Sequence, residues 1–210
     1  MPAKGEKMDG RKRDGFKADF ELYVISDSVP VLKKAVADGA GIVQLRDKSN
    51  DLNSILEKSK EIVLHKKRKS FIFILNDYPE LAAGVGADGV HIGQDMSYAE
   101  TRKIVGPDLI IGRSTHCLEQ GRRAEAEGAD YISVGPVFKT PTKPGRKAVG
   151  LEYVREAAAK IKIPRVAIGG IDLSNLDSVM KAGAKTIGVV RAAGDAAELL
   201  KKIGSNKLCA

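Results

Sequence analysis

The sequence predicts an α/β protein that folds as a single compact (β/α)8 TIM barrel. Short apolar segments rich in Val or Ile alternate with segments of helical pattern from Leu22 to Ile203. Several helical segments end in a glycine and an alanine, and a glycine just past a helix accepts the left-handed cap conformation. These pairs are Gly39-Ala40, Gly86-Ala87, Gly128-Ala129 and Gly183-Ala184. The repeat indicates eight βα units, which can close into a barrel, whereas an open sheet usually has fewer strands and a glycine-rich fingerprint after the first.

Each predicted strand is short, apolar and suited to burial on both faces, as parallel strands are. We expect strands at residues 22–26, 41–46, 71–76, 89–93, 109–114, 131–135, 165–169 and 186–190. A segment whose apolar residues recur with helical spacing follows each strand. We expect helices at residues 30–37, 52–67, 78–84, 98–105, 118–127, 151–160, 173–182 and 196–203. In such a barrel the active site lies at the carboxyl ends of the strands.

The length of 210 residues suits one domain. We expect residues 1–19 to form a basic flexible arm, residues 20–204 the catalytic barrel and residues 205–210 a tail. Cys117 and Cys209 lie far apart and indicate no disulfide framework, which fits the reducing cytoplasm. No apolar run approaches the roughly 20 residues of a membrane span, and the charged N-terminus does not resemble a secretory signal. The sequence leaves open whether the chain forms a homo-oligomer.

The formal net charge of +8 comes partly from the arm and partly from the basic run at residues 65–69. Such clusters can attract nucleic acid. The run falls at the end of a predicted helix, however, where cations complement the backbone dipole. The chain also has no tryptophan and few aromatic residues for base stacking. We therefore expect small anionic substrates and no nucleic-acid or membrane partner. The alternative is a non-catalytic binder of phosphorylated ligands or nucleic acid.

Polar side chains gather where the second predicted strand ends. Gln44 and Arg46 are two residues apart and share the inner face, and Lys48 can follow them as the strand gives way to the loop. An amide and two cations would then converge on one spot, where they could bind an anion. The alternative is a polar layer that an internal salt bridge satisfies.

Two carboxylates follow the third and fourth predicted strands, in Asn76-Asp77 and Gln94-Asp95. Carboxylates at neighbouring strand ends suit Mg²⁺, which shares its remaining positions between water and substrate phosphates. Without a cation they would repel each other. A simpler role for Asp77 is to cap the helix that begins directly after it. His91, inside the fourth strand, is expected to be a neutral core side chain.

The loop after the sixth predicted strand is expected to bind an anion. Between its prolines it holds the hydroxyls of Thr140 and Thr142 and the ammonium group of Lys143. Prolines lower the entropy that a loop loses on ordering, and hydroxyl and ammonium groups are donors that a phosphate needs. The alternative is a solvated basic loop.

The remaining strand ends add further donors. Ser114 and His116 close the fifth strand, and Gly170 follows the seventh, where the missing side chain lets backbone N–H groups approach a ligand. Val190 and Arg191 end the eighth strand. The loops after the seventh and eighth strands often bind phosphate in this barrel, so we expect a second anion pocket there.

Motifs at six successive strand ends together resemble the thiamine-phosphate synthase family. They are Gln44-Leu45-Arg46-x-Lys48, Asn76-Asp77, Gly89-Val90-His91-Ile92-Gly93-Gln94 with Asp95, Gly112-x-Ser114-Thr115-His116, Gly135-Pro136-Val137-Phe138-x-Thr140-x-Thr142-Lys143 and Ile168-Gly169-Gly170-Ile171. The resemblance implies a transferase of thiamine biosynthesis that uses Mg²⁺. Such an enzyme joins 4-amino-2-methyl-5-(diphosphomethyl)pyrimidine to 4-methyl-5-(2-phosphoethyl)thiazole and releases thiamine phosphate and diphosphate.

The resemblance also implies a role for each matched residue. The pyrimidine diphosphate would be held by Gln44, Arg46, Lys48, Asn76 and Lys143. The thiazole phosphate would be held by Thr140 and Thr142 with the backbone at Gly170, Val190 and Arg191. Ser114 would contact the pyrimidine or the leaving group, and the catalytic residues would be Lys48, Ser114 and Lys143. Mg²⁺ would be held by Asp77 and Asp95, although the family usually has one residue between the glutamine and the second aspartate, whereas here Asp95 follows Gln94 directly.

The residues suit this chemistry. The bond to diphosphate breaks if the leaving charge is spread over a metal and several cations, and ionisation then precedes attack by the thiazole nitrogen. No strong base or nucleophile is needed, because positioning and preorganised electrostatics supply most of the acceleration. The nearest alternative is the related thiazole tautomerase, which needs no diphosphate or metal site. Asn76-Asp77 and Thr140-x-Thr142-Lys143 argue against it.

Overall fold

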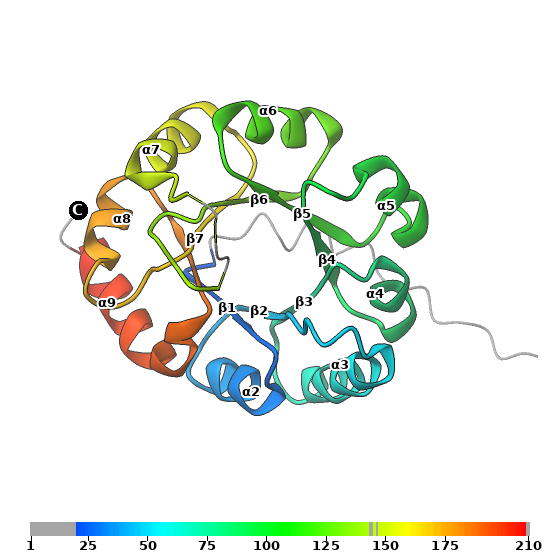
Figure 1. The fold of residues 1–210 in the computed structure, drawn as a ribbon. Coiled ribbons are helices and arrows are strands. Elements are labelled where there is room, and N and C mark those ends of the chain that lie inside the picture. The colour runs from blue at the N-terminus through cyan, green and yellow to red at the C-terminus, as the bar shows by residue number, and fades with distance from the viewer. Residues whose placement is uncertain (1–19, 143–144, 146, 209–210) are drawn as a thin grey trace, which may run out of the picture.

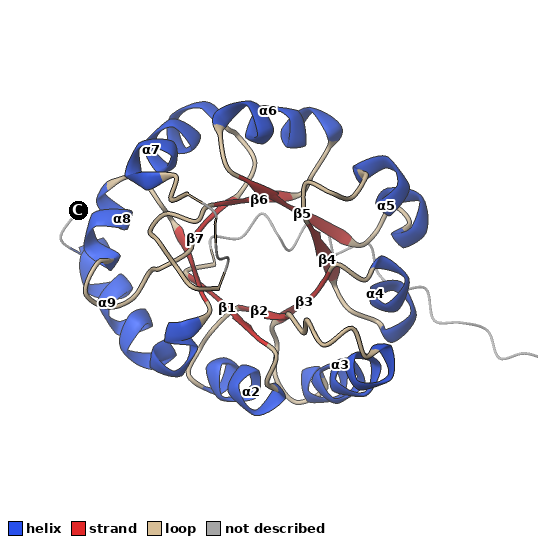
Figure 2. Cartoon of the chain, in the orientation of Figure 1, coloured by secondary structure: helices blue, strands red, loops and turns tan. Residues whose placement is uncertain are grey.

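The structure, a computed structural model, describes residues 20–142, 145 and 147–208. Eight parallel strands form a closed barrel in the order β1-β2-β3-β4-β5-β6-β7-β8, and the helices surround it (Figure 1). Figure 2 shows the strands as an inner ring and the helices as an outer ring. The predicted (β/α)8 barrel is therefore confirmed. The predicted N-terminal arm and Cys209 lie outside the described residues.

The strands follow the apolar segments of the sequence closely. They are β1 (Leu22–Ser26), β2 (Ile42–Leu45), β3 (Ile72–Asn76), β4 (Gly89–Ile92), β5 (Ile110–Thr115), β6 (Tyr131–Val134), β7 (Arg165–Ile168) and β8 (Thr186–Val189). Every strand begins and ends within about one residue of its predicted position. The reason is that a short Val- and Ile-rich run bounded by glycine or polar residues defines both ends of a strand narrowly.

The helices are α2 (Val29–Ala37), α3 (Leu52–Lys66), α4 (Pro79–Val85), α5 (Tyr98–Val105), α6 (Leu118–Glu127), α7 (Gly150–Lys160), α8 (Leu176–Lys181) and α9 (Ala196–Leu208), with a 3-10 segment η2 (Arg191–Asp195). Helix α8 begins later than predicted because the Asp172 carboxylate accepts bonds from the backbone and hydroxyl of Ser174 and forms a turn there. Helix α9 continues through residues 205–208, which were expected to be a tail. None of the helices in the described part is long and apolar enough to cross a membrane.

The two faces of each strand pack against different partners. Outward side chains such as Leu22 and Val24 belong to the large core between strands and helices. Side chains at the alternate positions form a smaller cluster inside the barrel, made of Tyr23, Ile25, Ile42, Ile74, Ile110, Tyr131 and Val166. This period of two is the strand geometry expected from the sequence. The barrel interior is therefore packed.

The parallel register sets polar residues above this inner cluster. Gln44 is two residues after Ile42, and Asn76 is two residues after Ile74, so both lie on the inner face towards the carboxyl ends. Asn76 of β3 pairs in register with His91 of β4. Ser114 of β5 pairs in register with Ser133 of β6. The carboxyl end of the barrel is thus a ring of polar side chains on an apolar layer.

Gly89, the first residue of β4, has no room for a side chain. A Cβ atom there would overlap the carbonyl oxygen of Ile110, and the backbone of the neighbouring strand cannot move aside easily. In contrast, nothing lies within 4 Å of that position at Gly84 of α4. We expect Gly89→Ala to lower the free energy of unfolding by about 1–3 kcal/mol. Gly84→Ala should raise it by about 0.5–1 kcal/mol. Urea unfolding measures both, and equal effects would contradict this account.

Candidate active site

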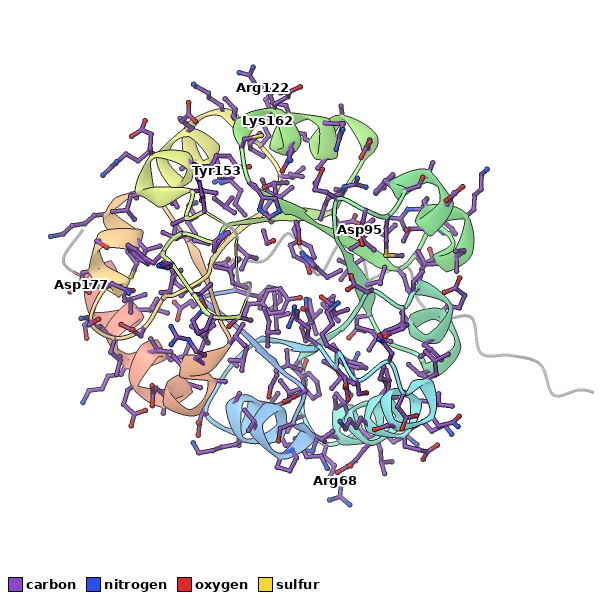
Figure 3. The ribbon with its side chains drawn as sticks, viewed as in Figure 1. Arg68, Asp95, Arg122, Tyr153, Lys162 and Asp177 are labelled. Carbon is purple, nitrogen blue, oxygen red and sulfur yellow. The ribbon has the colours of Figure 1, made fainter. Side chains whose placement is uncertain are left out.

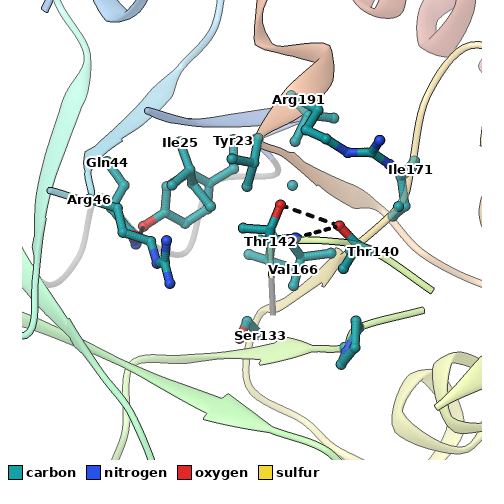
Figure 4. A pocket seen from close by; sticks show the side chains of 18 of the residues that line it. Tyr23, Ile25, Gln44, Arg46, Ser133, Thr140, Thr142, Val166, Ile171 and Arg191 are labelled. Carbon is teal, nitrogen blue, oxygen red and sulfur yellow. Dashed lines mark hydrogen bonds between the residues drawn. The ribbon is translucent and has the colours of Figure 1, made fainter. Parts of the chain in front are cut away.

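A cavity of about 260 Å³ lies at the carboxyl ends of the strands (Figure 4). Every strand of the barrel, or the loop directly after it, contributes to its lining. Most of the predicted site residues line it, namely Gln44, Arg46, Asn76, Ser114, Thr140, Thr142, Gly170, Val190 and Arg191. The structure therefore brings these residues, distant in sequence, to one cavity. Lys143 lies outside the described residues.

Arg46 and Gln44 differ in how their side chains are engaged. Gln44 is 2% exposed and its Nε2 donates to the Tyr23 hydroxyl at 2.7 Å. The Arg46 guanidinium has no ion-pair partner among the described residues and extends into the cavity in Figure 4. The alternative of a polar layer satisfied by an internal salt bridge thus fails for Arg46. Its charge can serve an anionic ligand.

Lys48 and Asp77 pair with each other. The Lys48 ammonium group donates to the Asp77 carboxylate, and the side chains are 51% and 30% exposed. Lys48 lies two residues after Arg46 and Asp77 one residue after Asn76, and both Arg46 and Asn76 line the cavity. Lys48, predicted to bind the diphosphate, and Asp77, predicted to bind the metal, thus form one ion pair beside the cavity. Both side chains are exposed enough to exchange this partner for a ligand.

The backbone of Asp77 is in an uncommon conformation. Its φ of 63° is left-handed, a region that Asp and Asn tolerate better than most residues. The simpler role considered for Asp77, capping α4, is wrong, because Tyr78 occupies the N-cap position without a side-chain capping bond and the Asp77 carboxylate pairs with Lys48. A conformation of this kind often occurs at a functional site.

Asp95, the second predicted metal ligand, lines a different pocket from the cavity. The lining of this second pocket also includes Arg102 of α5, Arg113 of β5 and Arg123 of α6. Asp95 is labelled in Figure 3. Its carboxylate folds back over the backbone of Gly93, where a Cβ atom would overlap it. Asp95 is therefore part of the second pocket and not of the cavity lining.

The loop that carries Lys48 is anchored by Asp47, which sequence reasoning did not single out. Asp47 accepts bonds from the Lys58 ammonium group of α3 at 2.6 Å and from the Ser49 backbone at 2.8 Å. The bond from Lys58 and those from Ser49 lower the pKa of Asp47 to about 2. Asp47 is therefore ionised at neutral pH and holds the start of the loop against α3.

The opposite side of the cavity is built by three loops. Oγ1 of Thr140 lies 3.3 Å from Oγ1 and from the backbone nitrogen of Thr142, which closes a tight turn. Gly170, with a φ of 67°, lies against this turn, and a Cβ atom there would come within 2.8 Å of the Phe138 Cβ. Figure 4 shows Arg191 beside these threonines. Hydroxyls, backbone and a guanidinium group thus converge, as phosphate binding requires.

Sequence reasoning did not assign Tyr23 or His91 to the site, although both line the cavity. His91 is 7% exposed, so it is buried as expected, but it also faces the cavity. Its ring nitrogens lie 2.9 Å from the Tyr131 hydroxyl and 3.0 Å from Oγ of Ser114. The period of two along β4 and β1 places both residues on the inner face and could have identified them. Burial raises the pKa of the Tyr23 and Tyr131 hydroxyls well above the ordinary value of a phenol, so both side chains are neutral.

Comparisons with known proteins agree with this geometry. A family model described as thiamine monophosphate synthase matches residues 22–193. A thiamine-phosphate synthase of Gloeobacter violaceus is 46% identical over 180 residues, covering 83% of this chain and 53% of that protein. One from Thermus thermophilus is 51% identical over 166 residues, covering 78% of this chain and 80% of that protein. A solved thiamine phosphate pyrophosphorylase from Pyrococcus furiosus is 34% identical with a TM-score of 0.81, covering 90% of this chain and 96% of that one.

The extent of these matches differs between relatives. The chain spans about half the length of some curated relatives, including that of Gloeobacter violaceus. It spans most of the Thermus thermophilus relative and nearly all of the Pyrococcus furiosus structure. In each comparison the match covers more than three quarters of this chain. The chain belongs to the thiamine monophosphate synthase family.

Proposed function

We propose that this chain catalyses the formation of thiamine phosphate. The substrates are 4-amino-2-methyl-5-(diphosphomethyl)pyrimidine and 4-methyl-5-(2-phosphoethyl)thiazole. The C–O bond to diphosphate breaks first, and diphosphate leaves with the bonding electrons. The thiazole nitrogen then donates its lone pair to the pyrimidine carbocation, which forms the new C–N bond.

The observation that best supports this proposal is a single cavity with anion-binding groups on two sides. Arg46 lies on one side, and Thr140, Thr142 and Arg191 lie on the other (Figure 4). Two substrates that each carry a phosphate group need such an arrangement if their reacting atoms are to meet between the charges. A tautomerase that binds one thiazole phosphate would need only one of the two sides.

Each group of side chains has a distinct task in this reaction. Gln44 and Asn76 orient the pyrimidine diphosphate, while Arg46, Lys48 and Lys143 stabilise the charge of the departing diphosphate. Ser114 contacts the pyrimidine or the leaving group. The thiazole phosphate is held by Thr140 and Thr142 with the backbone of Gly170, Val190 and Arg191.

We propose that Mg²⁺ is the cofactor, and Asp77 suits it. No three His, Cys, Asp or Glu side chains in the described part form a metal cluster. Mg²⁺ usually binds one or two carboxylates and takes its other ligands from water and substrate phosphates. Asp77 would hold the ion, and Asp95 would do so only if residues 93–97 turned its carboxylate from the second pocket to the cavity. The ion would neutralise diphosphate charge.

We further propose that the protein acts in the cytoplasm. Cys117 is exposed and free. An exposed thiol is maintained most easily in a reducing compartment.

A direct assay tests the proposed reaction. The purified chain is incubated with both phosphorylated heterocycles and Mg²⁺, and thiamine phosphate and diphosphate are measured by chromatography. We expect the two products in equal amounts, and no product without either substrate or with excess EDTA. Isomerised thiazole phosphate without thiamine phosphate would indicate a tautomerase instead. Salt-sensitive binding of DNA or RNA without any turnover would indicate a nucleic-acid binder.

A further inference from the structure

Five buried polar side chains form one hydrogen-bond chain through the inner face of the barrel. Gln44 Nε2 donates to the Tyr23 hydroxyl at 2.7 Å, and the hydroxyls of Tyr23 and Tyr131 are 2.8 Å apart. The Tyr131 hydroxyl lies 2.9 Å from Nδ1 of His91, whose Nε2 lies 3.0 Å from Oγ of Ser114. None of the five side chains belongs to a residue more than 7% exposed. The chain joins β2, β1, β6, β4 and β5.

Hydrogen counting fixes the direction of the first bond and limits that of the second. An amide nitrogen can only donate, so the Tyr23 oxygen accepts from Gln44. The Tyr23 hydroxyl keeps one hydrogen, and the Tyr131 oxygen is the other hydrogen-bond partner that the described residues offer it. In the arrangement proposed below, Tyr23 donates this hydrogen to Tyr131. A neutral phenol carries only one hydrogen, so the Tyr131 hydroxyl can donate only one hydrogen bond.

We propose that Tyr23 and Tyr131 are positioning residues that fix the tautomer of His91 and, through it, the direction of the Ser114 hydroxyl. Tyr131 accepts from Tyr23 and directs its own hydrogen to Nδ1 of His91. The imidazole then carries its hydrogen on Nε2 and donates it to Oγ of Ser114. The Ser114 oxygen is thereby engaged as an acceptor, and its hydrogen is turned towards the cavity.

A serine hydroxyl held as a donor suits a substrate atom that gains negative charge. This inference rests on the proposed function, in which diphosphate leaves as an anion. A donor whose direction is set beforehand needs no reorganisation when the bond breaks. With the opposite polarity, Ser114 would donate to His91 and would present only lone pairs to the leaving group, which would oppose ionisation.

Gly112 of β5 makes the space that this chain needs. Gly112 precedes Ser114 by two residues on the inner face of the same strand. A Cβ atom at Gly112 would overlap the ring and hydroxyl of Tyr131. The missing side chain therefore lets the Tyr131 phenol lie beside β5, within hydrogen-bond distance of His91.

Nitrogen NMR of the labelled full chain tests the tautomer without substrate or turnover. The spectrum of His91→Gln identifies the His91 signals among those of the three histidines. We expect the wild-type His91 ring to carry one hydrogen, on Nε2, and Tyr131→Phe to produce a mixture of both tautomers. A wild-type ring with its hydrogen on Nδ1, or with hydrogens on both nitrogens, overturns the proposal.

Kinetics test the connection to Ser114. We expect Tyr131→Phe and Tyr23→Phe each to lower kcat about tenfold, with KM changed less than about threefold. In a Ser114→Ala background Tyr131→Phe should cause no further loss, because both changes act on the same hydroxyl. Losses that multiply in the double variant overturn the proposal. A wild-type chain that forms no thiamine phosphate would remove the proposed function, while the NMR result would still decide the tautomer.

Tyr153→Phe is the matched control. Tyr153 is 4% exposed, and its hydroxyl lies 2.6 Å from Oγ1 of Thr115, on the outer face of β5. We expect this variant to lose stability as Tyr131→Phe does, yet to keep the His91 tautomer and a kcat within about twofold of wild type. A change of tautomer or a tenfold loss of kcat in Tyr153→Phe would show that the effects are general, and would overturn the proposal. If Tyr131→Phe does not fold, Tyr23→Phe provides the same two measurements.

Discussion

Replacing Asp77 with asparagine is expected to lower kcat/KM for thiamine phosphate formation at least about 100-fold. Asparagine tolerates the φ of 63° at this position and keeps the shape of the side chain, but it removes the charge that would hold Mg²⁺. The ion pair with Lys48 is half exposed, so its loss should cost at most about 1 kcal/mol of stability. Initial rates over a range of Mg²⁺ concentrations, with a thermal melt of the variant, separate loss of activity from unfolding.

Asp95→Asn is the matched comparison for Asp77→Asn. Because the Asp95 carboxylate lies in the second pocket, we expect a loss of about tenfold or less, through the position of its loop. Equal losses in the two variants would mean that Asp95 reaches the cavity when substrate binds. Wild-type activity in Asp77→Asn would remove the role proposed for Asp77.

Replacing Lys48 with alanine is also expected to lower kcat at least about 100-fold. The variant loses one of the cations that would stabilise the departing diphosphate, and it leaves the Asp77 carboxylate without the partner that it has in the structure. Lys48→Arg keeps the charge with a different geometry, so we expect it to recover only part of the lost rate. Single-turnover measurements with bound substrates report this step directly.

Lys33→Ala provides the control for Lys48→Ala. Lys33 of α2 forms an exposed ion pair with Glu61 of α3, so its removal also breaks a lysine–carboxylate contact and lowers the net charge equally. We expect its kcat to remain within about twofold of wild type, because it lies away from the cavity lining. Full activity in Lys48→Ala, or an equal loss in both variants, would contradict a specific role for Lys48.

Periodicity and strand-end chemistry were enough to predict much of the candidate site. Arg46 and Asn76 could be placed at the cavity because a strand points alternate side chains inward and a parallel barrel gathers all carboxyl ends at one face. The same reasoning placed Thr140 and Arg191 on the loops that build the other side. Each of these residues does line the cavity.

Other features depend on contacts that local pattern does not encode. Asp77 looked like a helix cap or a metal ligand, and in the structure it pairs with Lys48 of another strand end. Asp95 was predicted to be a metal ligand like Asp77, but in the structure it lines the second pocket. His91 was interpreted as a core residue, and it is both buried and part of the cavity wall. Side-chain partners of this kind depend on the register between distant strands.

The sequence by itself determined the barrel, the face that holds the site and the chemical types of group gathered there. The spacing of apolar residues and the glycines that follow helices are local signals that extend over a few residues. They can therefore be interpreted without knowing the tertiary contacts of each segment. Only the tertiary structure decided which group bonds to which, as with Tyr23 and Tyr131, which are 108 residues apart and share one hydrogen bond. The physical reason is that a hydrogen bond requires two atoms within about 3 Å, and such a distance between remote residues is set only when the barrel closes.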